Sequence, residues 1–255
     1  MRIISISNIK GGVGKTTTAA VLAAGLAEKD YRVLLIDSDP QTNLSICFMQ
    51  EQTDESPSLY HIYNEKKGID EIKIAVKDNL DLVVGDFELC NADLQFTKAG
   101  RLKMLKKAIR NINTKYDFII VDTPPNLGIL TLNAFISSDY VVVPMAVDSF
   151  SLKGVRLLKQ TLDDVADETE KVLPVAGILL TRYNSRTNVS KLLEKSLNSA
   201  AALLDTELFK SRIRQAVVLQ ESQVAKEDLF SYAPNAKVSE DYKGFIGEFL
   251  ERVGV

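Results

Sequence analysis

Cysteine and histidine are scarce in this chain of 255 residues. Cys47 and Cys90 are the only cysteines, and they lie too far apart for a C-x-x-C metal site. Two thiols in a chain of this length suit a reducing compartment, so we expect the cytoplasm and interpret both cysteines as small buried side chains. His61 is the only histidine and has no partner motif, which argues against histidine-based catalysis.

An excess of positive charge is also missing, because the formal net charge is −3 and the sequence pI is about 5.4. Such a balance excludes a surface that attracts nucleic acid as a whole, so any DNA contact must come from a local basic patch. The sequence also lacks an apolar run of about 20 residues and the basic start of a signal peptide. Export and membrane spanning are therefore not expected.

Short apolar runs rich in β-branched residues alternate with longer segments of helical spacing. Continuous hydrophobic runs are typical of strands that are covered on both faces, as in parallel sheets. Their alternation with helices predicts an α/β fold with a doubly wound, mainly parallel sheet flanked by helices. The predicted strands are 3–7, 33–37, 80–85, 117–122, 140–144 and 175–181, and the predicted helices are 16–29, 93–112, 152–170 and 189–204.

The chain shows no internal repeat, no low-complexity tract and no convincing linker. We therefore expect one domain over residues 1–255, without a helix-turn-helix domain before the first strand. The polar stretch 50–58 contains Pro57 and is predicted to be a surface loop.

A glycine-rich stretch, IKGGVGKTTT, follows the first predicted strand and precedes a predicted helix. In that context glycines let backbone N–H groups approach phosphate oxygens, and the helix directs its positive end at them. Lys15 would neutralise phosphate charge and the Thr16 hydroxyl would bind Mg²⁺. Ile9 stands where the usual phosphate loop has its first glycine, and an additional lysine, Lys10, follows it. The competing interpretation is a plain strand-to-helix turn.

Aspartates end two of the predicted strands. Asp122 closes FIIVD, where a carboxylate can hold Mg²⁺ through water. Asp37 and Asp39 lie at the end of the predicted strand 33–37, and one of them could orient or deprotonate an attacking water. Aspartates also end strands without any function, so only their combination with the glycine loop favours an ATPase.

Three ordered motifs identify a resemblance that runs nearly end to end. KGGVGKTT at 10–17, DSDPQTN at 37–43 and IIVDTPPNLGILTLNA at 119–134 resemble the ParA/Soj/MinD group of deviant Walker ATPases, and the ParA/Soj partition ATPases most closely. Segments 143–154, 177–190 and 232–242 are similar to ParA as well. The resemblance implies a deviant P-loop fold, binding of ATP and Mg²⁺, and an ATP-dependent homodimer.

The resemblance also implies roles for individual residues. Lys10 matches the signature lysine that reaches the partner's nucleotide, and Lys15 matches the Walker lysine. Asp39 matches the residue that positions the attacking water. Thr16, Asp39 and Asp122 together match the magnesium site, where the two aspartates act through bound water. Asn184 lies where the family recognises the base. The implied ATP-binding residues are Lys10, Gly11, Gly12, Val13, Gly14, Lys15, Thr16, Thr17 and Asn184.

Two other branches of the group fit the chain less well. MinD-like proteins end in a basic membrane-binding helix, whereas the predicted last helix here, 238–253, has an acidic polar face, so we expect its apolar stripe to pack in the core. Nitrogenase iron proteins need cluster-binding cysteines, and neither cysteine lies at the matching place.

For DNA, the resemblance points to basic residues in the last third of the chain. Arg186, Lys210, Arg212 and Arg214 are the candidates for nonspecific phosphate contacts, with ordinary solvated charge on a helix-and-loop surface as the alternative. Many Soj-like relatives carry another arginine where this chain has Val218.

The leading hypothesis is a partition ATPase whose slow hydrolysis is stimulated by a ParB-like partner, and which associates with the nucleoid. A positioning scaffold for a protein cargo, without DNA segregation, uses the same switch and remains open. A monomeric phosphoryl-transfer enzyme would need an acceptor pocket that the sequence does not reveal.

Overall fold

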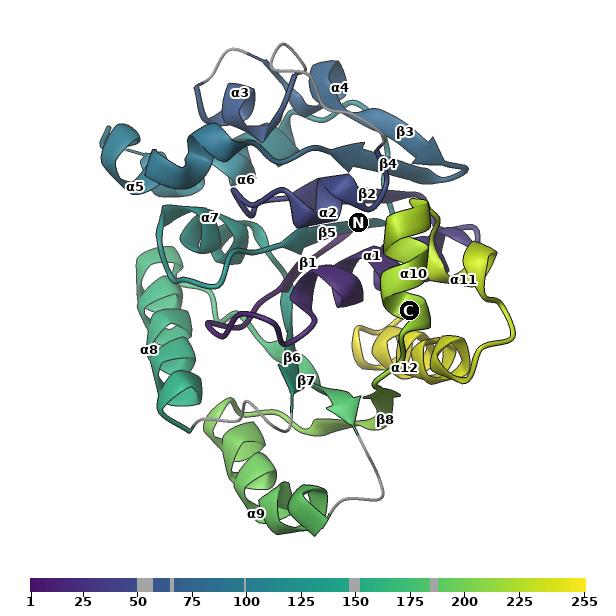
Figure 1. Cartoon of the computed structure of the whole chain (residues 1–255). Coiled ribbons are helices and arrows are strands. Elements are labelled where there is room, and N and C mark those ends of the chain that lie inside the picture. The colour runs from purple at the N-terminus through teal and green to yellow at the C-terminus, as the bar shows by residue number, and fades with distance from the viewer. Residues whose placement is uncertain (50–56, 65–66, 99, 147–151, 184–187) are drawn as a thin grey trace.

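We describe the protein from a computed structural model over residues 1–49, 57–64, 67–98, 100–146, 152–183 and 188–255, with the backbone alone for 188–195 (Figure 1). Among the predicted site residues, Asn184 and Arg186 lie outside these ranges, as does most of the predicted loop 50–58.

Eight strands form one sheet in the described part of the chain, in the order β3-β4-β2-β5-β1-β6-β7-β8. Neighbouring strands are parallel except for the pair β3 and β4, so the predicted doubly wound, mainly parallel fold is confirmed. The strands are β1 (Arg2–Ile6), β2 (Val33–Asp37), β3 (Ile74–Lys77), β4 (Leu80–Val83), β5 (Phe118–Asp122), β6 (Tyr140–Ala146), β7 (Val175–Tyr183) and β8 (Leu208–Arg214).

Helices cover both faces of this sheet, with α1, α11 and α12 on one face and α3, α6, α7, α8 and α9 on the other (Figure 1). The helices are α1 (Lys15–Ala27), α2 (Asn43–Ile46), α3 (Leu59–Tyr63), α4 (Ile69–Ile72), α5 (Ala92–Gln95), α6 (Met104–Arg110), α7 (Ile129–Ser137), α8 (Leu152–Thr169), α9 (Asn188–Leu203), α10 (Val218–Ala225), α11 (Leu229–Tyr232) and α12 (Lys237–Arg252), with 3-10 turns η1 (Phe87–Asn91) and η2 (Arg101–Lys103).

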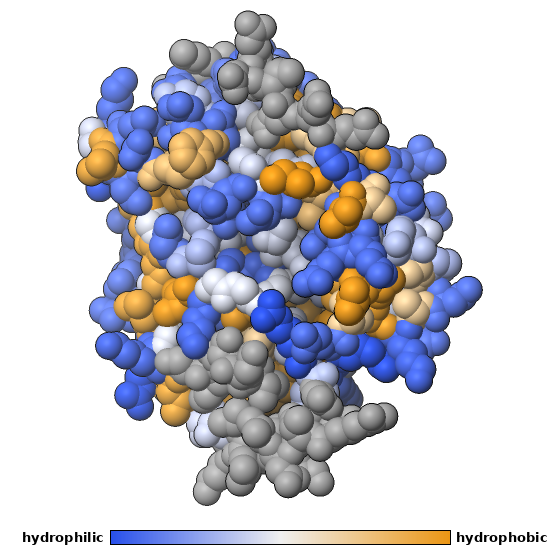
Figure 2. Space-filling view, viewed as in Figure 1, coloured by the Kyte–Doolittle hydropathy of each residue, from blue (hydrophilic) through white to orange (hydrophobic). Residues whose placement is uncertain are grey.

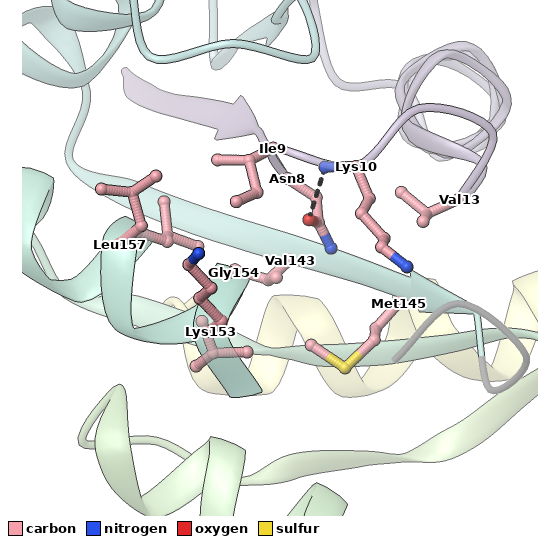
Figure 3. Close-up of a pocket in the computed structure, with 11 residues that line it drawn as sticks. Asn8, Ile9, Lys10, Val13, Val143, Met145, Lys153, Gly154 and Leu157 are labelled. Carbon is pink, nitrogen blue, oxygen red and sulfur yellow. Dashed lines mark hydrogen bonds between the residues drawn. The ribbon is translucent and has the colours of Figure 1, made fainter. Parts of the chain in front are cut away.

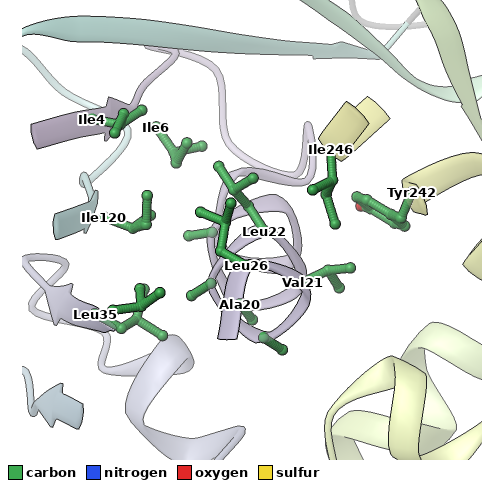
Figure 4. Close-up of a cluster of buried hydrophobic side chains, with 14 of the residues drawn as sticks. Ile4, Ile6, Ala20, Val21, Leu22, Leu26, Leu35, Ile120, Tyr242 and Ile246 are labelled. Carbon is green, nitrogen blue, oxygen red and sulfur yellow. The ribbon is translucent and has the colours of Figure 1, made fainter. Parts of the chain in front are cut away.

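Alternate residues of the central strands enter different cores, as the period of two along a strand requires. Ile4 and Ile6 of β1 pack against α1, whereas Ile3 packs on the opposite face. Figure 4 shows α1 enclosed by the strands on one side and by α12 on the other, with Leu22 and Leu26 among the strand side chains. The glycine loop is therefore held by a helix that is buried on nearly every side.

The apolar stripe of α12 is part of this core, as predicted. Tyr242, Phe245, Ile246 and Phe249 are each at most 1% exposed, so core packing and not lipid accounts for them. None of the helices in the described residues is long and apolar enough to cross a membrane.

The structure departs from the sequence analysis in three places. The predicted helix 93–112 is divided into α5, η2 and α6, because Gly100 adopts a left-handed conformation (φ +83°) that ends any helix. Strands β3 and β8 are absent from the predicted set, since both lie at the edges of the sheet and lack a continuous buried run: β3 has no buried residue, and β8 has only two. Cys47 is buried as expected, but Cys90 is exposed, because the turn η1 buries Leu89 instead.

Candidate nucleotide and magnesium site

The loop between β1 and α1 lies at the carboxyl ends of the parallel strands. Gly12 (φ +73°) and Gly14 (φ +84°) take left-handed conformations that residues with a side chain adopt at a cost, so these glycines set the path of the loop. Val13 is buried, and its carbonyl oxygen accepts a hydrogen bond of 2.8 Å from the Thr181 hydroxyl of β7. The loop is thus attached to the opposite half of the sheet.

Lys15 is the first residue of α1 and is only 6% exposed. Its Nζ donates to the carbonyl oxygen of Lys10 over 3.2 Å. Burial lowers the pKa of Lys15, while the carboxylates of Asp122 and Asp39 act in the opposite direction. A buried ammonium group that spans the loop in this way is suited to a polyanionic ligand such as a phosphate chain.

Asp122 at the end of β5 has no exposed surface, and neither of its oxygens has a hydrogen-bond partner among the described residues. Burial and the neighbouring Asp37 raise its pKa well above the usual range, with Thr16 and Lys15 acting against the rise. A buried carboxylate without a partner costs free energy unless a cation or proton compensates it. Asp122 and Thr16 therefore fit a magnesium site.

The remaining ligands of such an ion would not be protein carboxylates in a cluster. In the described part of the chain, no group of three or more His, Cys, Asp or Glu side chains could hold a metal ion. Magnesium usually keeps several waters and binds substrate phosphates, so one carboxylate beside a threonine hydroxyl is a sufficient protein contribution.

The two aspartates after β2 have different environments. Asp37 is fully buried and accepts hydrogen bonds from the Ser45 backbone N–H (2.8 Å) and hydroxyl (2.7 Å). Burial raises the pKa of Asp37 to about 6, although the bonds from Ser45 act against the rise. Asp39 instead lines the cavity beside the glycine loop, and its Oδ1 accepts from the Gln41 N–H over 2.9 Å. Of the two, Asp39 has the access to solvent that a water-positioning residue needs.

A cavity of about 590 Å³ collects most of the predicted nucleotide-binding residues. Its walls include Gly11, Gly12, Gly14, Lys15, Thr16, Thr17 and Asp39. Its volume is within the range of small-molecule sites. The structure thus brings together residues from the loop, from α1 and from the segment after β2.

The same cavity contains residues that the sequence did not single out. Arg182 of β7, which has a left-handed φ of +51°, and Gln220 and Gln223 of α10 line it. Gln223 Nε2 donates to the Thr17 hydroxyl over 3.2 Å, which connects α10 to the glycine-loop helix. These residues carry no sequence motif, because only the fold brings α10 beside α1.

Apolar side chains are exposed at the mouth of this cavity. Ile46 of α2 is 53% exposed and Val224 of α10 is 83% exposed, and both line the cavity. Figure 2 shows separate hydrophobic patches, in orange, where α2 and α10 lie in Figure 1, on a face that is otherwise mostly hydrophilic.

Lys10 lies outside this cavity and lines a neighbouring one of about 220 Å³ beside α8 (Figure 3). Its N–H donates to Asn8 Oδ1 over 3.0 Å, and Asn8 Nδ2 donates to the Pro144 carbonyl oxygen over 2.8 Å. The side chain of Ile9 packs against α8, where a Cβ added to Gly154 would lie 3.0 Å from Ile9 Cδ1. Where the usual phosphate loop has a glycine, Ile9 therefore makes a packing contact with α8. The next residue, Lys10, is exposed.

The described DNA candidates Lys210, Arg212 and Arg214 are exposed residues of the edge strand β8, not of a helix or loop. Their spacing of two places them on one face of that strand. Two of them have partners within the chain. The Arg212 guanidinium lies 4.7 Å from the Tyr183 ring centre, and Arg214 forms two side-chain bonds of 2.6 and 2.7 Å with Asp241.

Comparison with known proteins agrees with this geometry. A family model described as an AAA domain matches residues 1–175. The sporulation initiation inhibitor protein Soj of Bacillus subtilis is 34% identical over 243 residues, which cover 94% of this chain and 95% of Soj. The chain belongs to the ParA/Soj family.

Two solved structures resemble this ParA/Soj member over nearly its whole length. A plasmid partition protein of Borrelia burgdorferi bound to AMPPNP has a TM-score of 0.83 and 27% identity, with 98% of this chain and 99% of the other covered. Cobyrinic acid a,c-diamide synthase of Mycobacterium smegmatis, with an ATP analogue and magnesium, has a TM-score of 0.86 and 27% identity, with 100% and 96% covered.

Proposed function

We propose that this chain is a Mg²⁺-dependent ATPase that dimerises with ATP, binds DNA nonspecifically and acts in plasmid or chromosome partition with a ParB-like partner. The observation that carries the proposal is the separation of the two loop lysines. Lys15 is buried in the cavity of its own chain, whereas Lys10, five residues earlier, is exposed beside a different cavity. The similar structures bound to AMPPNP and to an ATP analogue support the choice of nucleotide.

The chain's own residues account for binding and for hydrolysis as follows. The loop backbone and Lys15 bind the phosphates, and Thr16 and Asp122 hold the magnesium ion, which would neutralise phosphate charge when bound. Asp39 orients the attacking water. Lys10 contacts the nucleotide of the other subunit, so that the γ-phosphate is needed for dimerisation and its loss releases the dimer.

The exposed apolar residues at the cavity mouth support a dimer that closes over the nucleotide. Ile46 and Val224 would lose water when a second subunit covers this face, and such burial is favourable by about 25 cal/mol per Å². The ion pair between Arg214 and Asp241 favours the alternative, an ATP-switched scaffold that positions a protein cargo, because it leaves less free charge for DNA.

The dimer is tested by light scattering after gel filtration of the Asp39→Ala variant. We expect a dimer with ATP and Mg²⁺ and a monomer with ADP, since the variant retains the phosphate contacts but hydrolyses slowly. Lys10→Ala is the matched control: it should bind ATP and stay monomeric. A monomeric Asp39→Ala variant that has bound ATP would contradict the mechanism.

A further inference from the structure

A second large cavity lies between α3 and the segment formed by α5, η2 and α6, which are neighbours in the upper left of Figure 1. Its volume is about 620 Å³, and it shares no described lining residue with the nucleotide cavity. Cavities of this size hold small molecules. Nothing in the ATPase cycle proposed above uses it.

One wall of this cavity is aromatic. The Phe96 ring centre lies 6.3 Å from that of Tyr60 and 5.4 Å from that of Tyr63. Tyr63 and Phe96 are 1% and 8% exposed, so the wall is set by packing, and the half-buried Tyr60 completes it. Of the three, Tyr60 offers a partly exposed ring on which a flat unsaturated ring can stack, and the buried rings of Phe96 and Tyr63 support it from behind.

The rim of the cavity is cationic. Lys98, Arg101 and Lys103 line it, and all three are exposed. Lys103 forms an ion pair of 3.3 Å with Glu168, but both side chains are about half exposed, and surface pairs of this kind are weak. The rim can therefore bind an anionic group, and Arg101 offers a planar fork that suits phosphate.

The cations around this rim belong to a local concentration of charge. Residues 98–115 contain seven lysines and arginines and no acidic residue, whereas the rest of the chain holds 24 of the 31 basic residues and all 34 acidic ones, a formal charge of −10. Partial burial and then the neighbouring Arg110, Lys171 and Lys103 lower the pKa of Lys106. An anion is attracted to this surface even though the protein as a whole is acidic.

We propose that this cavity is a second ligand site for a nucleoside monophosphate or a ligand of the same chemistry. The base stacks on Tyr60, which Phe96 and Tyr63 support, and the phosphate binds Lys98, Arg101 and Lys103 at the rim. A duplex nucleic acid cannot place its bases in a cavity, since they are paired and stacked within the helix. The site is independent of the glycine loop.

Calorimetric titration of the full chain tests this site after the glycine loop has been saturated with ADP and Mg²⁺. The probes are AMP, GMP, CMP and UMP, with inorganic phosphate for the charge alone. We expect one site for at least one nucleotide and binding weakened at least about tenfold by Arg101→Ala, because that change removes a charge-assisted hydrogen bond. Arg101 is exposed, so the variant should fold.

Lys106→Ala is the matched control, because it removes the same charge from the same segment but does not line the cavity. Its nucleotide affinity should stay within about twofold of the parent's, since only screened long-range attraction is removed. An equal weakening in both variants would show diffuse attraction and overturn the proposal. The proposal also fails if none of the four nucleotides binds, or if inorganic phosphate binds as tightly as they do.

Discussion

Asp37 ends β2 and Asp122 ends β5. The two residues are paired in the register of these neighbouring parallel strands, and both are fully buried. Burial raises the pKa of each, so the folded, nucleotide-free protein holds protons that the unfolded chain releases. Stability is therefore lost as pH rises from the unfolded pKa to the folded one. The site stores an electrostatic cost that a bound cation can relieve.

The Asp37→Asn variant should lose much of this pH dependence. A pKa of about 6 in the folded protein, against an ordinary value of 3.8, corresponds to a contribution of about 3 kcal/mol to the free energy of unfolding. This contribution is present at pH 4 and absent above pH 6. Relative to the parent, the variant should therefore gain up to about 3 kcal/mol in the free energy of unfolding between pH 4 and 7. Urea unfolding at both pH values measures this, with the exposed Asp78→Asn as control for net charge. A parallel pH dependence in Asp37→Asn and parent would contradict it.

Asp122→Asn should separate stability from activity. Without magnesium, the change removes a buried carboxylate that lacks a hydrogen-bond partner in the described residues, so unfolding at pH 7 should cost about 1–3 kcal/mol more. ATP hydrolysis should fall at least about a hundredfold, because the proposed magnesium site loses its carboxylate. Thermal unfolding without nucleotide and a phosphate-release assay give the two readouts. A less stable variant would mean that Asp122 is compensated within the chain.

At the scale of elements, α1 is the helix on which the site depends, and its packing is tight. A Cβ added to Gly25 would lie 2.3 Å from Ile246 Cδ1 of α12 and 2.8 Å from Phe230 Cε2 of α11. Glycine is required here by the close approach of α12 and not by backbone conformation.

Gly25→Ala should therefore destabilise the protein by about 1–3 kcal/mol, although alanine favours a helix by about 1 kcal/mol over glycine. Gly247→Ala in α12 is the matched control, since nothing described lies within 4 Å of the added Cβ. It should stabilise the protein by up to about 1 kcal/mol. Chemical unfolding of both variants measures the difference, and the same sign for both would refute this account of the packing.

At the scale of the whole molecule, the basic face of β8 lies on the outermost strand of the sheet, next to β7, and its three basic side chains are exposed. Arg214 is held by Asp241 and Arg212 by Tyr183, so DNA must compete with interactions inside the chain. Because these internal interactions must be broken when DNA binds, we expect the affinity for DNA to be low even for nonspecific binding.

Arg212→Ala combined with Arg214→Ala should weaken ATP-dependent binding to random duplex DNA. It should also reduce the slope of log K against log salt by about 0.9 for each phosphate that the protein no longer neutralises. Lys29→Ala combined with Lys115→Ala removes the same charge from other exposed positions and is the control. Fluorescence anisotropy at several salt concentrations gives both slopes. No DNA binding by the parent at low salt would favour the cargo scaffold.

Local patterns predicted most of the fold and the centre of the site. Apolar runs located six strands, and the motif around Lys15 together with Asp39 after β2 located the nucleotide cavity. Patterns failed where burial is one-sided or the backbone changes direction: β8 buries only Phe209 and Ile213 among polar residues, and Gly100 divides a segment that has helical spacing on both sides.

The order of residues alone determined that glycine, lysine, threonine and aspartate meet at the carboxyl ends of parallel strands, because strand, loop and helix follow one another locally. The tertiary structure decided which aspartate has access to the cavity, that Lys10 and Lys15 enter different cavities, and that α10 closes on Thr17. It also gathered Tyr60, Phe96 and Arg101 around one cavity. These outcomes depend on packing between segments that are distant in the sequence. A local pattern does not encode which side chains become buried or exposed when the helices pack against the sheet.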